Sequence, residues 1–173
     1  AEESGKSAKD LGDVFWVIDP LDGTANYNRE IPMCCVSIAL VKNMKPMLGV
    51  IYDFNNDHIY AGDKFSNTST NNNEPINVSD VENKENGILI TGLPHNSDYS
   101  DESLSKMIKD MQTWKKVRMI GSAAIAACYI ASGKGDRYEE KGIYLWDIIA
   151  GAAIVESAGG TAEISNLREN FQV

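Results

Sequence analysis

The chain is poor in basic residues: 16 lysines and arginines stand against 25 aspartates and glutamates, and the formal net charge is −9. Proteins that bind nucleic acid neutralise its phosphates with cations, so this charge balance predicts no nucleic-acid partner. Histidine is also scarce, because only two are present, which disfavours a zinc hydrolase. Neither histidine stands at a recognisable spacing from Ser37 or Ser122, so nothing indicates a serine nucleophile.

Cysteine and long apolar runs are equally limited. Cys34, Cys35 and Cys128 show neither a C-x-x-C spacing nor a disulfide pattern, which predicts reduced thiols in a cytoplasmic protein. No run is long and apolar enough to span a membrane, and no secretory signal is visible, so we expect no membrane partner. The 173 residues, 43% of them hydrophobic, suffice for one sizeable core.

Two carboxylates stand close together where an apolar run ends, in the stretch W-V-I-D-P-L-D-G-T of residues 16–24. Residues 14–18 are predicted to form a buried strand that Pro20 ends, because proline lacks a ladder donor and fixes φ. Asp19 and Asp22 would then lie on a rigid turn and repel each other. A hard divalent cation such as Mg²⁺, or an added proton, would relieve that repulsion.

The two residues after this pair, Gly23 and Thr24, can offer backbone N–H groups to an anion, since glycine allows close approach of the main chain. A metal and a phosphate could therefore meet here. Asp-Pro-x-Asp-Gly is equally ordinary turn chemistry, so this motif alone leaves both interpretations open.

A second acidic motif begins a predicted helix at residues 146–160, W-D-I-I-A-G-A-A-I-V-E-S-A-G-G. Asp147 is favoured by the N–H groups exposed at a helix start, and Gly159 and Gly160 are typical of a helix end. By itself, the segment reads as a capped helix whose small residues allow close packing.

The remaining pattern predicts alternating strands and helices without internal repeats, which favours a layered α/β domain. The polar residues 66–73 are expected to form an exposed loop. In chain order, the other expected elements are a hairpin of strands 34–41 and 47–52, a strand at 58–62, a strand at 87–91, an amphipathic helix at 101–113, a strand at 117–120, and a helix capped by Ser122 that runs through Ala131.

Together, the two aspartate motifs resemble those of the inositol monophosphatase family of Mg²⁺-dependent, lithium-sensitive phosphatases. In that family, W-x-I-D-P-[LI]-D-G-T and W-D-x-x-A-G build one site. The opening residues 1–4, A-E-E-S, are similar to the family's Gly-Glu-Glu segment, and residues 121–124 and 140–147 resemble segments that line the substrate pocket. The resemblance implies a layered αβαβα sandwich and a single domain over residues 1–173. It also implies that the chain lacks the N-terminal helices and the C-terminal end that family members usually carry.

The resemblance also implies roles for individual residues. The metal ligands of two or three Mg²⁺ ions would be Glu2, Asp19, Asp22, Asp147 and the backbone carbonyl of Leu21. The substrate would contact Asp22, Gly23, Thr24, Ala123 and Glu140. Catalysis would involve Asp19, with Glu2 and Thr24 orienting and deprotonating the attacking water.

The implied function is a Mg²⁺-dependent phosphomonoesterase that hydrolyses inositol monophosphate or a similar small polyol or sugar phosphate by metal-activated water. Glu140 favours a polyol substrate, because its carboxylate would accept hydrogen bonds from hydroxyl groups. Two alternatives lie in the same superfamily, namely fructose-1,6-bisphosphatase and 3′-phosphoadenosine 5′-phosphate phosphatase. A third is a metal-binding or regulatory module without catalysis. The family resemblance further implies a homodimer.

Overall fold

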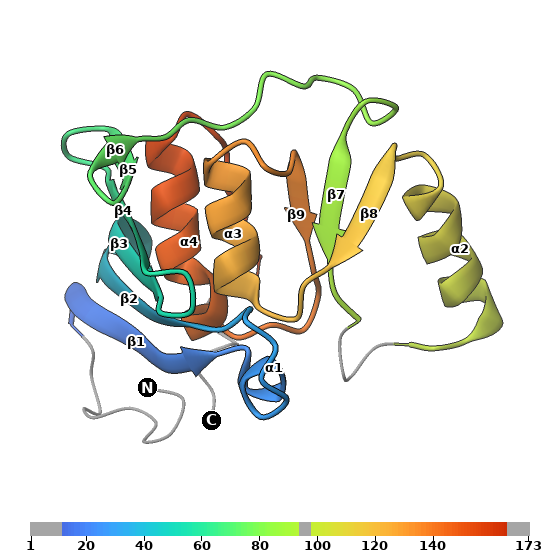
Figure 1. Ribbon diagram of the computed structural model, residues 1–173, viewed down its shortest axis with the longest axis horizontal. Helices are drawn as coiled ribbons and strands as arrows, with labels where there is room; N and C mark the ends of the chain where they lie inside the picture. The colour runs from blue at the N-terminus through green and yellow to red at the C-terminus, as the bar shows by residue number, and fades with distance from the viewer. Residues whose placement is uncertain (1–11, 94–97, 166–173) are drawn as a thin grey trace.

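Two β-sheets enclose a pair of helices, and a further helix lies outside the smaller sheet (Figure 1). The computed structural model describes residues 12–93 and 98–165. Its layers follow one another as sheet, helix pair, sheet and helix, which confirms the predicted layered α/β class. Within these residues, no helix combines the length and the apolarity needed to cross a bilayer.

The larger sheet is an antiparallel meander whose six strands lie side by side in chain order. The predicted hairpin and the strand after it are confirmed. The expected loop at residues 66–73 is wrong, because Thr68–Asn71 forms a strand that pairs with its predecessor and buries Ser69. A polar strand is stable here because its ladder hydrogen bonds to the strands on either side do not depend on apolar side chains. The strands are β1 (Val14–Asp22), β2 (Cys35–Lys42), β3 (Lys45–Asp53), β4 (His58–Asp63), β5 (Thr68–Asn71) and β6 (Glu74–Pro75).

The first strand differs from its prediction in two ways. It is not buried on both faces, because Val14, Trp16 and Ile18 are exposed while the residues between them are buried. It also does not end at Pro20. The pairing with β2 skips the proline, which has no N–H to donate, and resumes at Asp22 after an irregular step.

Helix α4 (Leu145–Ser157) rests directly on the larger sheet because two glycines face each other beneath it. A Cβ atom at Gly49 would lie 2.1 Å from the carbonyl oxygen of Ala150, and one at Gly62 would lie 2.4 Å from the Cα of Ile154. Both distances are far below ordinary contact, so only residues without a side chain allow this approach.

Helix α3 (Ala123–Ala131) packs beside α4 between the sheets, and eight of its nine residues are buried. Gly151 of α4 permits the contact, since a Cβ there would lie 2.3 Å from the Cβ of Ala127. The predicted cap is confirmed: the Ser122 hydroxyl accepts a hydrogen bond from the N–H of Ile125 at 3.2 Å.

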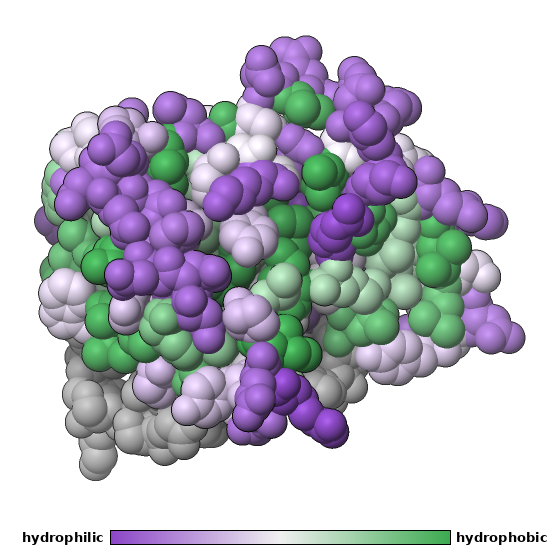
Figure 2. Space-filling model, in the orientation of Figure 1, coloured by the Kyte–Doolittle hydropathy of each residue, from purple (hydrophilic) through white to green (hydrophobic). Residues whose placement is uncertain are grey.

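The smaller sheet is parallel, with β7 (Ile88–Thr91) between β8 (Lys116–Met119) and β9 (Arg137–Glu139), and the sequence did not predict β9. The predicted amphipathic helix forms as α2 (Asp101–Met111), which has no fully buried residue. On the face seen in Figure 2, hydrophilic side chains gather along the top, whereas hydrophobic residues show toward α2 at the right.

Candidate functional site

Asp19 and Asp22 lie at the irregular end of β1, and both side chains are buried, with 1% and 8% of their surface exposed. The N–H of Leu21 donates to Oδ1 of Asp19 at 3.0 Å, so the turn at the proline holds the first carboxylate in place. The skipped ladder step at Pro20 therefore turns both acidic side chains inward from one strand.

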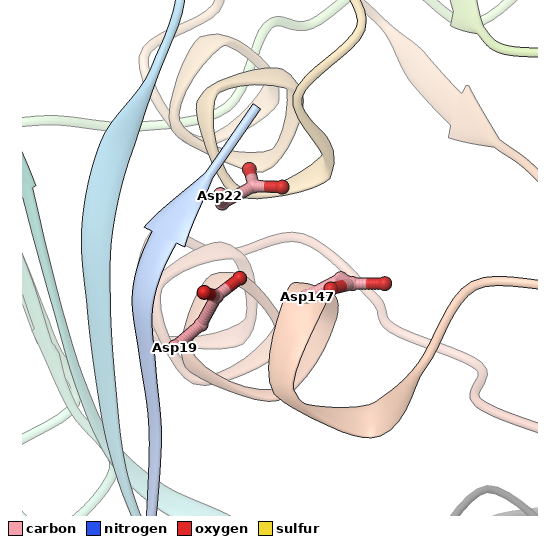
Figure 3. A group of neighbouring side chains, drawn as sticks. All are labelled: Asp19, Asp22 and Asp147. Carbon is pink, nitrogen blue, oxygen red and sulfur yellow. The ribbon is translucent and has the colours of Figure 1, made fainter. Parts of the chain in front are cut away.

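Asp147 joins them from the first turn of α4 (Figure 3). Its Oδ2 accepts the N–H of Tyr144 at 2.7 Å, which caps the helix and fixes the carboxylate at the positive end of the helix dipole. One carboxylate oxygen from each of the three aspartates lies within 4.8 Å of the other two. The structure thus brings together the two motifs that the sequence singled out.

Asp22 is further held by the beginning of α3. Its Oδ2 accepts a hydrogen bond from the Ser122 hydroxyl and another from the N–H of Ala124 at 2.8 Å. Burial raises the pKa of Asp22, and these hydrogen bonds partly offset that rise because they favour the charged form.

This donor set suits a hard divalent cation. All three candidate ligands are carboxylates, two of them are buried, and their oxygens converge within one coordination sphere. A divalent ion would offset both the mutual repulsion of the carboxylates and the cost of burying them. Mg²⁺ therefore fits this group of residues.

Gly23 and Thr24 follow directly at the start of the short helix α1 (Thr24–Tyr27). Gly23 has a φ of 82°, and a Cβ there would lie 2.7 Å from the carbonyl oxygen of Met33, so both the conformation and the space require glycine. The Thr24 hydroxyl donates to the carbonyl oxygen of Leu21 at 3.0 Å. This contact places Thr24 beside the backbone carbonyl for which the resemblance implies a metal-binding role.

Burial raises the pKa of Glu140, and the charge of Asp22 adds a smaller effect in the same direction. The Tyr138 hydroxyl donates to Oε2 of Glu140 at 2.8 Å. Gly92 leaves the room for this carboxylate, because a Cβ there would lie 2.3 Å from both Glu140 oxygens. Glu140 is thus half-buried, and its carboxylate is held by Tyr138.

Some functional contacts could not be read from the sequence. Ser122 was recognisable as a helix cap but not as a partner of Asp22, which lies 100 residues away along the chain. Nothing in the sequence marked Tyr138 as a hydrogen-bond partner of Glu140. Ala123 is buried next to the Ala124 N–H that binds Asp22. Glu2 lies outside the described residues.

The cysteines are all buried free thiols, as predicted. Cys35 approaches the site, with its Sγ 3.9 Å from Oδ2 of Asp22. Burial, together with the nearby charge of Asp22, raises the pKa of this thiol far above its usual range. Cys35 therefore stays protonated and acts as a weak donor or a packing group.

The sequence model of the inositol monophosphatase family matches residues 1–167. The chain belongs to this family. Inositol monophosphatase from Anabaena (Nostoc) sp. is a similar solved structure, with a TM-score of 0.84 and 34% identity, covering 94% of this chain and 68% of that one.

Two curated relatives are similar at the level of sequence. Inositol-1-monophosphatase of Synechocystis sp. is 36% identical over 162 residues, which cover 92% of this chain and 56% of the relative. A protein named Nus factor SuhB from Xylella fastidiosa is 36% identical over 148 residues, which cover 85% of this chain and 54% of the relative. The chain thus spans little more than half the length of these two relatives.

Proposed function

We propose that this protein is a Mg²⁺-dependent phosphomonoesterase that hydrolyses inositol monophosphate or a similar small polyol phosphate. The observation that carries the proposal is the convergence of Asp19, Asp22 and Asp147, whose carboxylate oxygens lie within 4.8 Å of one another. Membership in the inositol monophosphatase family supports the same chemistry.

The three aspartates would hold the metal, joined by the Leu21 carbonyl and by Glu2. Two or three ions would share these ligands. Bound Mg²⁺ supplies a water of lowered pKa and neutralises charge on the phosphate and the leaving oxygen.

The chain's own groups would position the other reactants. Gly23 and Thr24 would bind the phosphate through the main chain beside Asp22, where the left-handed glycine turns the backbone into helix α1. The Thr24 hydroxyl, which now donates to the Leu21 carbonyl, would orient the attacking water together with Glu2. Asp19 stays in place through its hydrogen bond from the Leu21 N–H.

Glu140 would select the alcohol part of the substrate. Its carboxylate accepts hydrogen bonds from hydroxyl groups, and Tyr138 already fixes one of its oxygens. Together with the backbone at Ala123, this arrangement favours a polyol monophosphate over 3′-phosphoadenosine 5′-phosphate and fructose 1,6-bisphosphate, because a carboxylate would repel the second phosphate that each of them carries.

The test is phosphate release from inositol 1-phosphate, fructose 1,6-bisphosphate and 3′-phosphoadenosine 5′-phosphate, each with Mg²⁺ and with chelator. We expect turnover that needs Mg²⁺ and favours the inositol ester. Preference for another ester would change the assigned substrate but would leave the proposed metal-dependent mechanism in place. Absence of turnover while Mg²⁺ still binds would favour a non-catalytic metal-binding or regulatory module.

The metal site has its own test, which does not need turnover. Asp22→Asn should abolish most of the thermal stabilisation that Mg²⁺ provides, because it removes one buried charged ligand. Asp80→Asn makes the same chemical change at an exposed position and should leave that stabilisation unchanged. Equal Mg²⁺ stabilisation in both variants would show that Asp22 is not a ligand. We also propose that the protein is a cytoplasmic homodimer. Light scattering would test the dimer, because it measures the molar mass of the protein in solution.

A further inference from the structure

One oxygen of Asp22 is fully occupied by protein donors. Oδ2 accepts the Ser122 hydroxyl and the Ala124 N–H, and the Cys35 thiol lies 3.9 Å away. A carboxylate oxygen has two lone-pair directions, so two good donors leave none of them for a metal ion. Only Oδ1 of Asp22 can then serve a cation.

The Ser122 hydroxyl also accepts a hydrogen bond, from the first turn of α3. Its oxygen accepts the N–H of Ile125 at 3.2 Å as the N-cap of α3, and it is 5% exposed. A hydroxyl has a single proton, and here that proton goes to Asp22. Because α3 is almost entirely buried between the sheets, the serine cannot follow a shift of the carboxylate.

From these contacts we infer that Ser122 is a positioning residue for the metal centre: its hydroxyl holds Oδ2 of Asp22 against α3, so that Asp22 binds a metal through Oδ1 alone. The inference deepens the proposed function and rests on it for the identity of the ion. Figure 3 shows the three aspartates, with Asp147 on the first turn of its helix and Asp22 on the neighbouring strand.

The chain offers a matched control for the loss of a helix cap. Ser100 caps α2 in the same way, since its hydroxyl accepts the N–H of Ser103 at 3.4 Å, and α2 contributes none of the three clustered aspartates. Ser100→Ala and Ser122→Ala both remove a capping hydroxyl, but only Ser122→Ala releases Asp22. Ser122→Thr keeps the hydroxyl and serves as the rescue variant.

The first readout is the Mg²⁺ concentration that gives half of the maximal thermal stabilisation. We expect Ser122→Ala to raise it by about 10-fold or more, the usual cost of losing a group that orients a metal ligand. Ser122→Thr should stay within about 3-fold of wild type, and Ser100→Ala within about 2-fold, because neither loses the bond to Asp22. An equal effect of Ser122→Ala and Ser100→Ala would overturn the inference.

The second readout needs no metal and separates this inference from the proposed function. In metal-free protein, Ser122→Ala should lower the melting temperature more in the wild-type background than in Asp22→Ala, because only the former leaves a buried carboxylate short of a donor. Equal losses in both backgrounds would show that no such coupling exists and overturn the positioning role. A wild-type protein that gains no stability from Mg²⁺ would instead overturn the metal assignment, while coupling in this cycle would still support the contact.

Discussion

The contact between helix α4 and the larger sheet gives a sharp prediction at Gly62. In Gly62→Ala the new Cβ would lie 2.4 Å from the Cα of Ile154, about 1 Å closer than the 3.4 Å at which ordinary contact begins. Overpacking of this kind costs about 1–3 kcal/mol, and we expect a value near 3 because the obstacle is helix backbone, which cannot rotate away. For a chain of this size, that loss lowers the melting temperature by about 6–12 °C.

The same change should weaken the metal site, because Asp147 is carried by the displaced helix. Thermal melts with increasing Mg²⁺ measure both effects, and the half-saturating Mg²⁺ concentration should rise in Gly62→Ala. The matched control is Gly87→Ala, where the new Cβ would meet the Trp114 ring at 3.0 Å. The Trp114 ring, and the carbonyl oxygen of Asn83 at 3.3 Å, would need to shift by only a few tenths of an ångström, so we expect a loss below about 1 kcal/mol and no change in Mg²⁺ dependence. A melting temperature for Gly62→Ala equal to that of Gly87→Ala would refute the close packing of α4 on the larger sheet.

Two further predictions concern one half-buried and one buried carboxylate. Burial raises the pKa of Glu140 above its ordinary 4.5, so the stabilising effect of its neutral form is present below that pH and is lost as pH rises through the folded-state pKa. Melts without Mg²⁺ should therefore show wild type losing stability relative to Glu140→Gln as the pH rises above 4.5, and a constant difference would contradict this. Asp53 is 2% exposed and accepts the N–H groups of Asn55 and Asn56 at 3.2 Å each. Asp53→Ala should cost about 2 kcal/mol in urea unfolding, because it leaves those donors without their acceptor, and a change under 0.5 kcal/mol would argue against it.

Local sequence patterns predicted most of the elements well. Helix α4 was predictable from the sequence because the acidic residue at its start and the glycines after its end each act through local hydrogen bonds. The failures have equally local reasons. β5 is polar and short, and β9 has three residues, so neither has the apolar alternation that marks a strand. Both form because a neighbouring strand supplies the ladder partner.

The sequence by itself determined the family and the chemical character of the site, because each aspartate motif is contiguous and its residue types are specific to oxygen ligation and tight turns. Only the tertiary structure decided how these motifs meet. Asp147 reaches Asp19 and Asp22 because α4 lies directly on Gly49 and Gly62, and Ser122 reaches Asp22 because α3 is packed beside α4. Such contacts join residues far apart in the chain, and they depend on how closely whole helices and sheets can approach rather than on any local pattern.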